Sequence, residues 1–232
     1  MGRTGVLIAL AVAATVGLVF GLYPELDLRI AAPFFDPASG LWAVKGLPAL
    51  HLRNAASWLI ALIAAPAFVA LAVKLVRPRR PMLLPCRAAV LMIVTLALGP
   101  GLLANVILKD QWGRPRPIDV VEFGGTDPFV PWWDPRGVCP KNCSFIAGEP
   151  SGAFWTLAPA ALAPPAWRAL AYGAALAFGA AIGFLRIAGG GHFFTDVVFS
   201  GVFTFLLIWF VHGLLYRWPT RIRGAPQNKP PL

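Results

Sequence analysis

Charged side chains are scarce in this sequence, at 13% of the 232 residues, whereas hydrophobic residues make up 58%. Soluble globular domains carry about 25% charged residues. The shortage of charge excludes an ordinary soluble domain and favours a membrane protein. Cysteine and histidine are rare as well, with three residues of each, so few ligands are available for a metal site.

The sequence contains several long hydrophobic runs. A helix that crosses a bilayer needs about 20 predominantly apolar residues, and six runs approach that length. The sequence therefore predicts an all-α, polytopic membrane protein with six transmembrane helices. The fourth run is short and contains Pro159, which makes it the weakest of the six. The runs are approximately Val6–Leu22, Ala55–Val76, Ala88–Leu108, Ser151–Ala163, Ala169–Leu185 and Phe193–Tyr216.

Acidic residues number 10 against 20 Lys and Arg, which gives a net charge of +10. Nucleic-acid binding does not follow from this excess, because the basic residues gather at alternate ends of the hydrophobic runs. The positive-inside rule places these ends and both termini in the cytoplasm, and the lipid bilayer is the expected partner of the runs. The first run, which follows Arg3, also fits a signal peptide, but its length favours a retained anchor. The Pro-rich, basic segment 219–232 is expected to be a disordered cytoplasmic tail.

A glycine-rich stretch between the fifth and sixth runs carries Arg186, His192 and Asp196. If a helix begins where the glycines end, His192 and Asp196 lie on one helix face. Asp196 would then hold one imidazole nitrogen and leave the other free as a nucleophile. The glycines let backbone N–H groups approach an anion, and Arg186 offers a planar fork for phosphate oxygens. The stretch predicts half of a phosphate-transfer site, and a glycine turn capped by His and Asp is the alternative.

Three cations, Lys109, Arg114 and Arg116, follow the third run at its outer end. Positive charge on this side opposes the positive-inside rule, and an anionic ligand is the simplest explanation. Glu149 stands just before the fourth run, where a carboxylate commonly only complements the positive end of a helix dipole. Burial near the membrane would instead raise its pKa and let it act as a general acid.

Cys139 and Cys143 lie four residues apart in the same outer segment. This spacing predicts a disulfide in an oxidising compartment. A metal site is not expected there, because only His51 and His192 lie on that side of the membrane.

In this order, the polar stretches resemble the type 2 phosphatidic acid phosphatase superfamily, integral-membrane lipid phosphatases that share a helical core with vanadate-dependent haloperoxidases. The first family motif, Lys, six residues and Arg-Pro, is matched by Lys109 and Arg116-Pro117. The third, Ser-Arg, five residues, His, three residues and Asp, is matched except at Leu185, which replaces the Ser. The resemblance covers roughly residues 88–216, the core of a single predicted domain of residues 1–218.

The second family motif, Pro-Ser-Gly-His, has two possible registers here. One places it on Pro150–Ala153, keeps Ser151 and loses the His. The other follows flanking residues that family members often share, Ser-Phe before the motif and Ala-Ser-x-Ala-Phe after it, and places the motif on Ile146–Glu149. We prefer the second register, in which Glu149 takes the position of the His and Ala147 takes that of the Ser.

The resemblance implies a phosphohistidine mechanism. His192 attacks the phosphorus of a lipid phosphate monoester, while Asp196 fixes the tautomer of the imidazole. Glu149 protonates the departing lipid oxygen and then activates the water that releases phosphate. The charge of the phosphate is neutralised without a metal or other cofactor. The implied phosphate-binding groups are Lys109, Arg116, Arg186 and the backbone of Gly148, with Arg114 and Ser151 as further candidates.

Within the superfamily, the chain is most similar to bacterial lipid A phosphatase-type members, on the outer amphipathic segment Pro24–Ile30, the Phe123–Gly125 and Asn142–Phe145 stretches and Glu149. The site would face the periplasm from the inner membrane, with a lipid A-like substrate favoured. Phosphatidylglycerophosphate, phosphatidic acid and undecaprenyl pyrophosphate are alternative substrates. A lipid phosphotransferase and a non-catalytic lipid-phosphate binder or transporter are alternative functions. The sequence does not indicate an oligomeric state.

Overall fold

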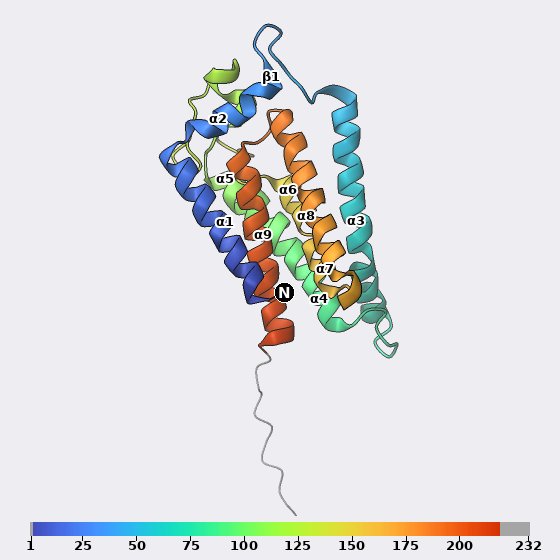
Figure 1. Ribbon diagram of the computed structural model, residues 1–232. Helices are drawn as coiled ribbons and strands as arrows, with labels where there is room; N and C mark the ends of the chain where they lie inside the picture. The colour runs from blue at the N-terminus through green and yellow to red at the C-terminus, as the bar shows by residue number, and fades with distance from the viewer. Residues whose placement is uncertain (1, 219–232) are drawn as a thin grey trace, which may run out of the picture.

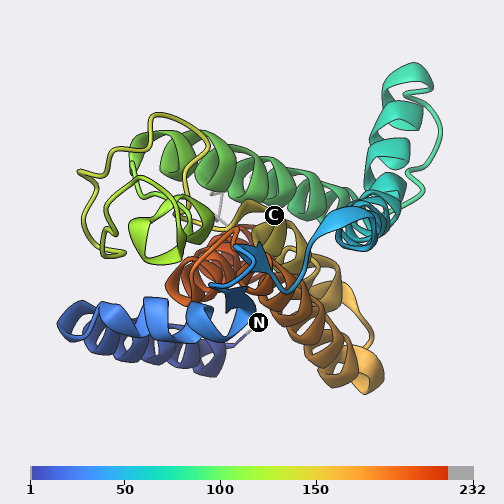
Figure 2. The same cartoon turned by 90° about the horizontal axis from the view of Figure 1, so that it is seen from above.

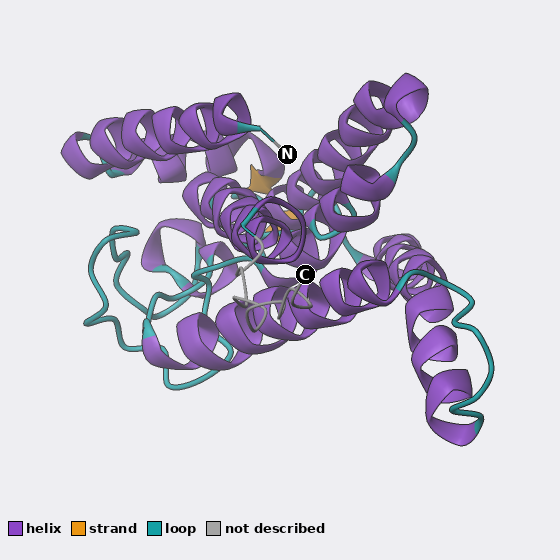
Figure 3. Ribbon diagram, turned by 90° about the horizontal axis from the view of Figure 1, so that it is seen from below, coloured by secondary structure: helices purple, strands orange, loops and turns teal. Residues whose placement is uncertain are grey.

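The structure, a computed structural model, describes residues 2–218, in which helices predominate and are joined by loops with almost no strand (Figure 1 and Figure 3). The predicted all-α class is confirmed. Strand β1 (Phe35–Asp36) pairs antiparallel with β2 (Leu41–Trp42) in a short hairpin. The predicted tail lies outside the described part of the chain. The helices are α1 (Arg3–Leu22), α2 (Glu25–Ala31), η1 (Ala32–Phe34), α3 (Gly46–Val76), α4 (Cys86–Leu96), η2 (Ala97–Leu108), α5 (Lys109–Gln111), η3 (Pro117–Asp119), η4 (Val121–Phe123), α6 (Gly148–Phe154), α7 (Leu157–Leu162), α8 (Pro165–Ala188), α9 (Phe194–His212) and η5 (Gly213–Arg217).

Five helical segments of the described chain are long and apolar enough to cross a membrane, so the protein is a multi-pass membrane protein. Helix α9 stands in the middle of the bundle (Figure 2) and contacts α1, α4, α6, α8 and η2. The most apolar window of the α9 segment is 44% buried, against 11% for α1, which leaves most of α1 available to lipid. The five segments are Arg3–Leu22, Gly46–Val76, Cys86–Gln111, Pro165–Ala188 and Phe194–Arg217.

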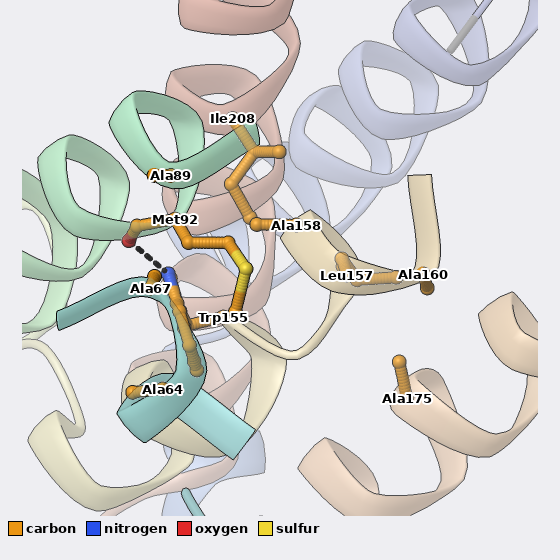
Figure 4. Packing of buried hydrophobic residues seen from close by; sticks show 10 residues of the cluster. All are labelled: Ala64, Ala67, Ala89, Met92, Trp155, Leu157, Ala158, Ala160, Ala175 and Ile208. Atoms are coloured by element: carbon orange, nitrogen blue, oxygen red, sulfur yellow. Dashed lines mark hydrogen bonds between the residues drawn. The ribbon is translucent and has the colours of Figure 1, made fainter. Parts of the chain in front are cut away.

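The fourth predicted run forms two short helices, α6 and α7, instead of one long helix. Pro159 lacks the N–H that would continue the helix from Trp155, and the N–H of Ala158 bonds the Trp155 carbonyl in a tighter turn. The Trp155 indole is fully buried in a cluster of mostly small side chains and donates to the Met92 carbonyl at 3.2 Å (Figure 4). This segment is therefore enclosed by other helices rather than exposed to lipid.

The third predicted run changes from an α-helix to a π-helix at Ala97, where α4 continues into η2. Pro100 lies within η2 and contributes no backbone N–H. The Asn105 side chain, from the same segment, donates to the Pro100 carbonyl at 2.7 Å. Asn105 is thereby fixed beside the start of α6.

One end of the bundle is closed by α2, the β-hairpin and the segment between α5 and α6 (Figure 1). A buried hydrophobic cluster holds this cap together. Because Phe193 immediately precedes α9, the cap packs directly on the start of the central helix. Cys139 and Cys143 in the cap are joined by a disulfide. The members of the cluster are Ala31, Trp42, Val120, Phe123 and Phe193.

Candidate active site

The glycine-rich stretch forms a tight loop between α8 and α9 that only glycine can occupy. Gly190 has a φ of +67°, and a Cβ there would lie 2.4 Å from the Trp42 ring. A Cβ on Gly191 would lie 2.2 Å from Nη2 of Arg186. The absence of side chains at these positions therefore lets the Arg186 guanidinium rest against the loop that carries His192.

His192 is almost fully buried, and its Nδ1 lies 2.8 Å from the backbone carbonyl oxygen of Ser144. Because a carbonyl only accepts, this contact places the imidazole proton on Nδ1 and leaves the Nε2 lone pair free. Helix α9 begins at Phe194, after His192, so the predicted shared helix face is wrong. The Asp196 carboxylate is 3.9 Å from Nδ1, so it does not hold the imidazole by a hydrogen bond.

Asp196 instead holds the residue that bonds the imidazole. Its carboxylate accepts from the Ser144 hydroxyl at 2.5 Å and from the Phe193 N–H at 2.8 Å. As the third residue of α9, it also complements the N-terminal end of that helix. Asp196 therefore acts on His192 through Ser144, which supplies both a hydroxyl to the acid and a carbonyl to the imidazole.

Two of the predicted phosphate contacts lie inside the protein instead. Arg114 is fully buried, and its guanidinium pairs with Asp27 at 2.8 Å and with Asp196 at 2.5 Å. Ser151 is also buried, with its hydroxyl 2.8 Å from that of Thr204 between α6 and α9. Neither side chain has a free hydrogen-bonding group to offer a phosphate. The prediction that Arg114 and Ser151 bind phosphate is therefore wrong, and both residues instead join parts of the fold.

Lys109 and Arg116 meet at Asn142, in the loop closed by the Cys139–Cys143 disulfide. The Lys109 Nζ lies 3.1 Å from the Asn142 side-chain oxygen, and Arg116 donates to the Asn142 carbonyl at 2.6 Å. Asn142 has a φ of +54°, a left-handed conformation that Asn tolerates better than most residues. In the sequence this residue was named only as part of the Asn142–Phe145 stretch and not as a site residue, although an Asn between two cysteines four positions apart is a recognisable turn signal.

The positive charges of the two matched motifs lower the pKa of the His192 imidazole. Burial, and then nearby positive charge with Arg186 foremost, holds the pKa of His192 well below its ordinary value. A neutral imidazole with a free Nε2 is the form that acts as a nucleophile near neutral pH. The positive charges come from Arg186, Lys109 and Arg116.

Glu149 is held between two arginines. Arg53 donates to its carboxylate at 2.5 and 3.0 Å, and Nε of Arg186 lies 3.2 Å from the other oxygen. Burial alone would raise the pKa of Glu149, but hydrogen bonding to Arg53 and the charge of Arg186 lower it below its ordinary value. The expected rise is therefore wrong for the ligand-free site, in which Glu149 is a carboxylate.

Arg53 is another site residue that the sequence reasoning missed. The second predicted run began at Ala55, whereas α3 begins at Gly46 and so carries Arg53 on its side toward α6. The missed signal was its charge at the predicted outer end of a span, where the positive-inside rule does not expect a basic residue. The same argument had already drawn attention to Lys109 and its neighbours.

The two registers of the second motif lead to different surroundings. Gly148 begins α6, and a Cβ there would lie 2.3 Å from Oδ1 of Asn105, so the close approach requires glycine. Ala153, the position of the His in the rival register, is fully buried among Ala56 and Ile182. In the preferred register the His position of the motif is held by Glu149, which lies beside the cations. In the rival register it is held by Ala153, which lies in the packed core.

A groove of about 370 Å³ leads away from the site between α3, η2, α6 and α8. Its upper end is polar and includes Arg53, Asn105, Lys109 and Glu149, whereas residues such as Ile60 make its lower end apolar. A larger apolar cavity of about 620 Å³ between α1, α8 and α9 contains none of the predicted site residues. The smaller groove is therefore the one suited to a ligand with a charged head and an apolar body.

Among residues 2–218, no group of three or more His, Cys, Asp or Glu side chains is arranged to hold a metal ion.

Comparison with known proteins adds independent findings. A family model described as the PAP2 superfamily matches residues 88–220. The chain is 34% identical over 232 residues to a lipid A 4'-phosphatase of Francisella tularensis subsp. novicida (strain U112), over 94% of this chain and 98% of that protein. It is 38% identical over 104 residues to a lipid A 4'-phosphatase of Rhizobium leguminosarum, over 45% of each chain. No solved structure matches the chain.

Proposed function

Because the chain belongs to the PAP2 superfamily and is a membrane phosphatase of that family, we propose that it removes phosphate from a lipid A-like lipid at the periplasmic face of a bacterial inner membrane. The observation that carries this proposal is the setting of His192. Its Nδ1 is engaged by the Ser144 carbonyl, and three cations act on the ring. The adjoining groove passes from charged to apolar lining, which matches the two ends of a lipid phosphate.

The first chemical step transfers the phosphoryl group to the enzyme. Nε2 of His192 attacks phosphorus, the bond to the lipid oxygen breaks, and a phosphohistidine forms. Lys109, Arg116 and Arg186 neutralise the charge of the phosphoryl oxygens. The ion pair with Glu149 involves only Nε of Arg186, at 3.2 Å, so the two Nη groups of its fork are left for the phosphoryl oxygens.

The proton for the leaving oxygen passes through Glu149. A phosphate monoester has its second pKa near about 6, so part of it arrives with one proton. Transfer of that proton to the Glu149 carboxylate provides the acid that the departing lipid oxygen requires. In the second step the carboxylate takes a proton from water, the water oxygen attacks phosphorus, and His192 is released together with inorganic phosphate.

The proposed topology has six crossings with both termini in the cytoplasm. The start of α4 lies at the opposite end of the bundle from the cap, as does the start of α8 (Figure 1). The chain must therefore cross between the cap and α8, and α6 with α7 supplies that crossing. The basic residues of the end away from the cap, among them Arg77 and Arg168, support a cytoplasmic assignment for it under the positive-inside rule.

The test is incubation of the purified protein with a panel of lipid phosphates, including lipid A and phosphatidic acid. We expect release of inorganic phosphate together with a lipid product lighter by one phosphate, both measured by mass spectrometry. His192→Ala should reduce release to background. A labelled phosphate that appears on a second lipid would identify a phosphotransferase, and binding without release would identify a lipid-phosphate binder.

A further inference from the structure

Asp27 is a buried acid that the proposed chemistry does not use. It lies on α2, the amphipathic outer helix, yet it is only 1% exposed. Its carboxylate accepts from the Thr195 N–H at 3.0 Å, from the Thr195 hydroxyl at 2.6 Å and from Arg114 at 2.8 Å. A surface helix can be anchored by apolar side chains alone, and a buried carboxylate is costly unless it is paired. The position of Asp27 therefore calls for an explanation.

An unbroken series of hydrogen bonds leads from Asp27 to the nucleophile. Asp27, Arg114 and Asp196, hereafter the buried cluster, are joined because Arg114 places one nitrogen on each acid. The other Asp196 oxygen accepts from the Ser144 hydroxyl, and the Ser144 carbonyl accepts from Nδ1 of His192 at 2.8 Å. Every side chain in the series is at most 2% exposed, so water does not compete for these bonds.

The charges in the series bear on the reaction. The buried cluster contains two carboxylates and one guanidinium, so Asp27 draws part of the Arg114 charge away from Asp196. Asp196 lies 3.9 Å from Nδ1, and the ring becomes positively charged when Nε2 bonds to phosphorus. A carboxylate that is not fully neutralised stabilises that positive ring, most effectively where water is excluded.

We propose that Asp27 is a positioning residue for His192. Through Arg114 and Thr195 it fixes the Asp196 carboxylate beneath Ser144, whose carbonyl keeps the imidazole proton on Nδ1 and directs Nε2 toward the phosphate. The inference rests on the proposed role of His192 as the nucleophile. It differs from a purely anchoring role for Asp27, in which α2 would be held in place without any influence on the imidazole.

The first experiment reads the imidazole directly and needs no turnover. The chain has three histidines, so ¹⁵N-histidine labelling gives a simple NMR spectrum, and His192→Ala assigns the resonance. We expect the Nδ1–H tautomer in the unmodified protein and a mixture of tautomers in Asp27→Asn. The matched control is Glu25→Gln on the same helix, because the Glu25 side chain is 45% exposed and lies 3.9 Å from Arg29. This control should leave the spectrum unchanged.

The second experiment separates positioning from anchoring by kinetics. Loss of a residue that orients a metal ligand typically costs about 10- to 100-fold, and we expect a comparable loss of kcat in Asp27→Asn, because Asp27 orients the nucleophile in the same indirect way. KM should change less than about twofold. In a double-mutant cycle with Asp196→Asn, the two losses should be strongly non-additive, because both act through one series of contacts. Inorganic phosphate binding should be retained, because the three cations are untouched.

If Asp27→Asn does not fold, Thr195→Val provides the second variant, because it removes a hydroxyl from the same junction and keeps every charge. The proposal is overturned if whichever variant folds keeps the Nδ1–H tautomer and full kcat, or if its losses are additive with Asp196→Asn. Full turnover of His192→Ala would instead refute the proposed phosphohistidine mechanism. The tautomer measurement distinguishes these two failures.

Discussion

Two groups of acids and arginines contact the site, and they differ in their access to water. The buried cluster is at most 1% exposed and bonds only to protein groups. The open cluster, Arg53 and Arg186 with Glu149 between them, has side chains that are 40%, 12% and 34% exposed. The same kind of ion pair therefore occurs once as a closed structural unit and once at a groove that a ligand can enter.

This difference determines what each pair can do. A buried ion pair that loses one partner leaves an uncompensated charge in a medium of low polarity, so the buried cluster cannot exchange partners. The open cluster can, because water and an arriving phosphate both reach it. Arg114 and Arg186 each pair with an acid of the site, Asp196 and Glu149 respectively, but only Arg186 is available to a substrate. Exposure, rather than residue type, separates the two roles.

The largest expected effect is on turnover, at the acid of the open cluster. Glu149→Gln keeps the shape of the side chain but cannot carry the proton, and general acid–base catalysis typically contributes about 100- to 10,000-fold. We expect kcat to fall within that range, with little change in KM, in steady-state phosphate release. Glu149→His should recover part of the activity. The control is Glu122→Gln, which changes an exposed acid in the cap, and equal losses in both variants would contradict the assigned role.

The effects on stability should be the reverse of those on turnover, with the larger loss in the buried cluster and the smaller loss in the open cluster. Arg114→Gln leaves two buried acids without their cation, and we expect a loss of about 3–5 kcal/mol in the free energy of unfolding. Arg53→Gln removes a side chain that is 40% exposed, and the expected loss is about 0–1 kcal/mol. Unfolding of both variants in the same detergent measures the difference. Similar losses would mean that the two clusters are equally structural.

The pH dependence should change when Arg53 is removed. Hydrogen bonding to Arg53 is the largest influence that lowers the pKa of Glu149, and burial opposes it. In Arg53→Gln the hydrogen bond that lowers the pKa of Glu149 is lost, whereas the burial that raises it remains. This pKa therefore rises, and the acidic limb of the kcat–pH profile moves to higher pH. Arg53→Lys, which keeps the charge but not the planar fork, should shift the limb less. An unmoved limb in both variants would show that another group sets it.

The same shift affects stability. Because the folded-state pKa of Glu149 is lowered, its pairing stabilises the fold above the unfolded pKa of about 4.3. That contribution is lost as the pH falls through the lower, folded-state pKa. The acid-induced loss of stability should therefore be smaller in Arg53→Gln than in the unmodified protein when unfolding is followed across that pH range.

The smallest expected effect comes from the disulfide, which touches neither cluster. Replacing Cys139 and Cys143 with serine frees the loop that presents Asn142 to Lys109 and Arg116. A typical hydrogen bond contributes about 0.5–1.5 kcal/mol, so KM should rise about 2- to 10-fold with kcat nearly unchanged. Cys86→Ser changes an exposed free cysteine in α4 and serves as the control. An unchanged KM in the double serine variant would separate the disulfide from phosphate binding.

The sequence allowed prediction of the elements that depend on composition and spacing. Five of the six hydrophobic runs became helices of membrane-spanning length, and the spacing of the first and third motifs identified the cations and His192. The fourth run could be recognised as apolar but not as two short helices. That outcome depends on the missing N–H of Pro159 and on the space around Trp155, and the latter is set by other helices.

The contacts that could not be predicted join segments far apart in the chain. Asp27 and Thr195 are 168 positions apart, and Arg53 and Glu149 are 96 apart. The partner of the His192 imidazole is a backbone carbonyl, which every residue carries and which therefore leaves no signal in the sequence. Arg114 fitted a phosphate ligand by residue type and position, and only its burial assigns it to the interior.

The central place of α9 has a consequence for biosynthesis. Among the membrane-spanning segments of residues 2–218, this helix is the last to leave the ribosome, yet it is the one on which α1, α4 and α6 pack. The earlier helices are therefore made before their common partner. Synthesis that stops short of α9 would leave them without the helix that follows His192 and carries Asp196, so the site can assemble only after α9 has been made.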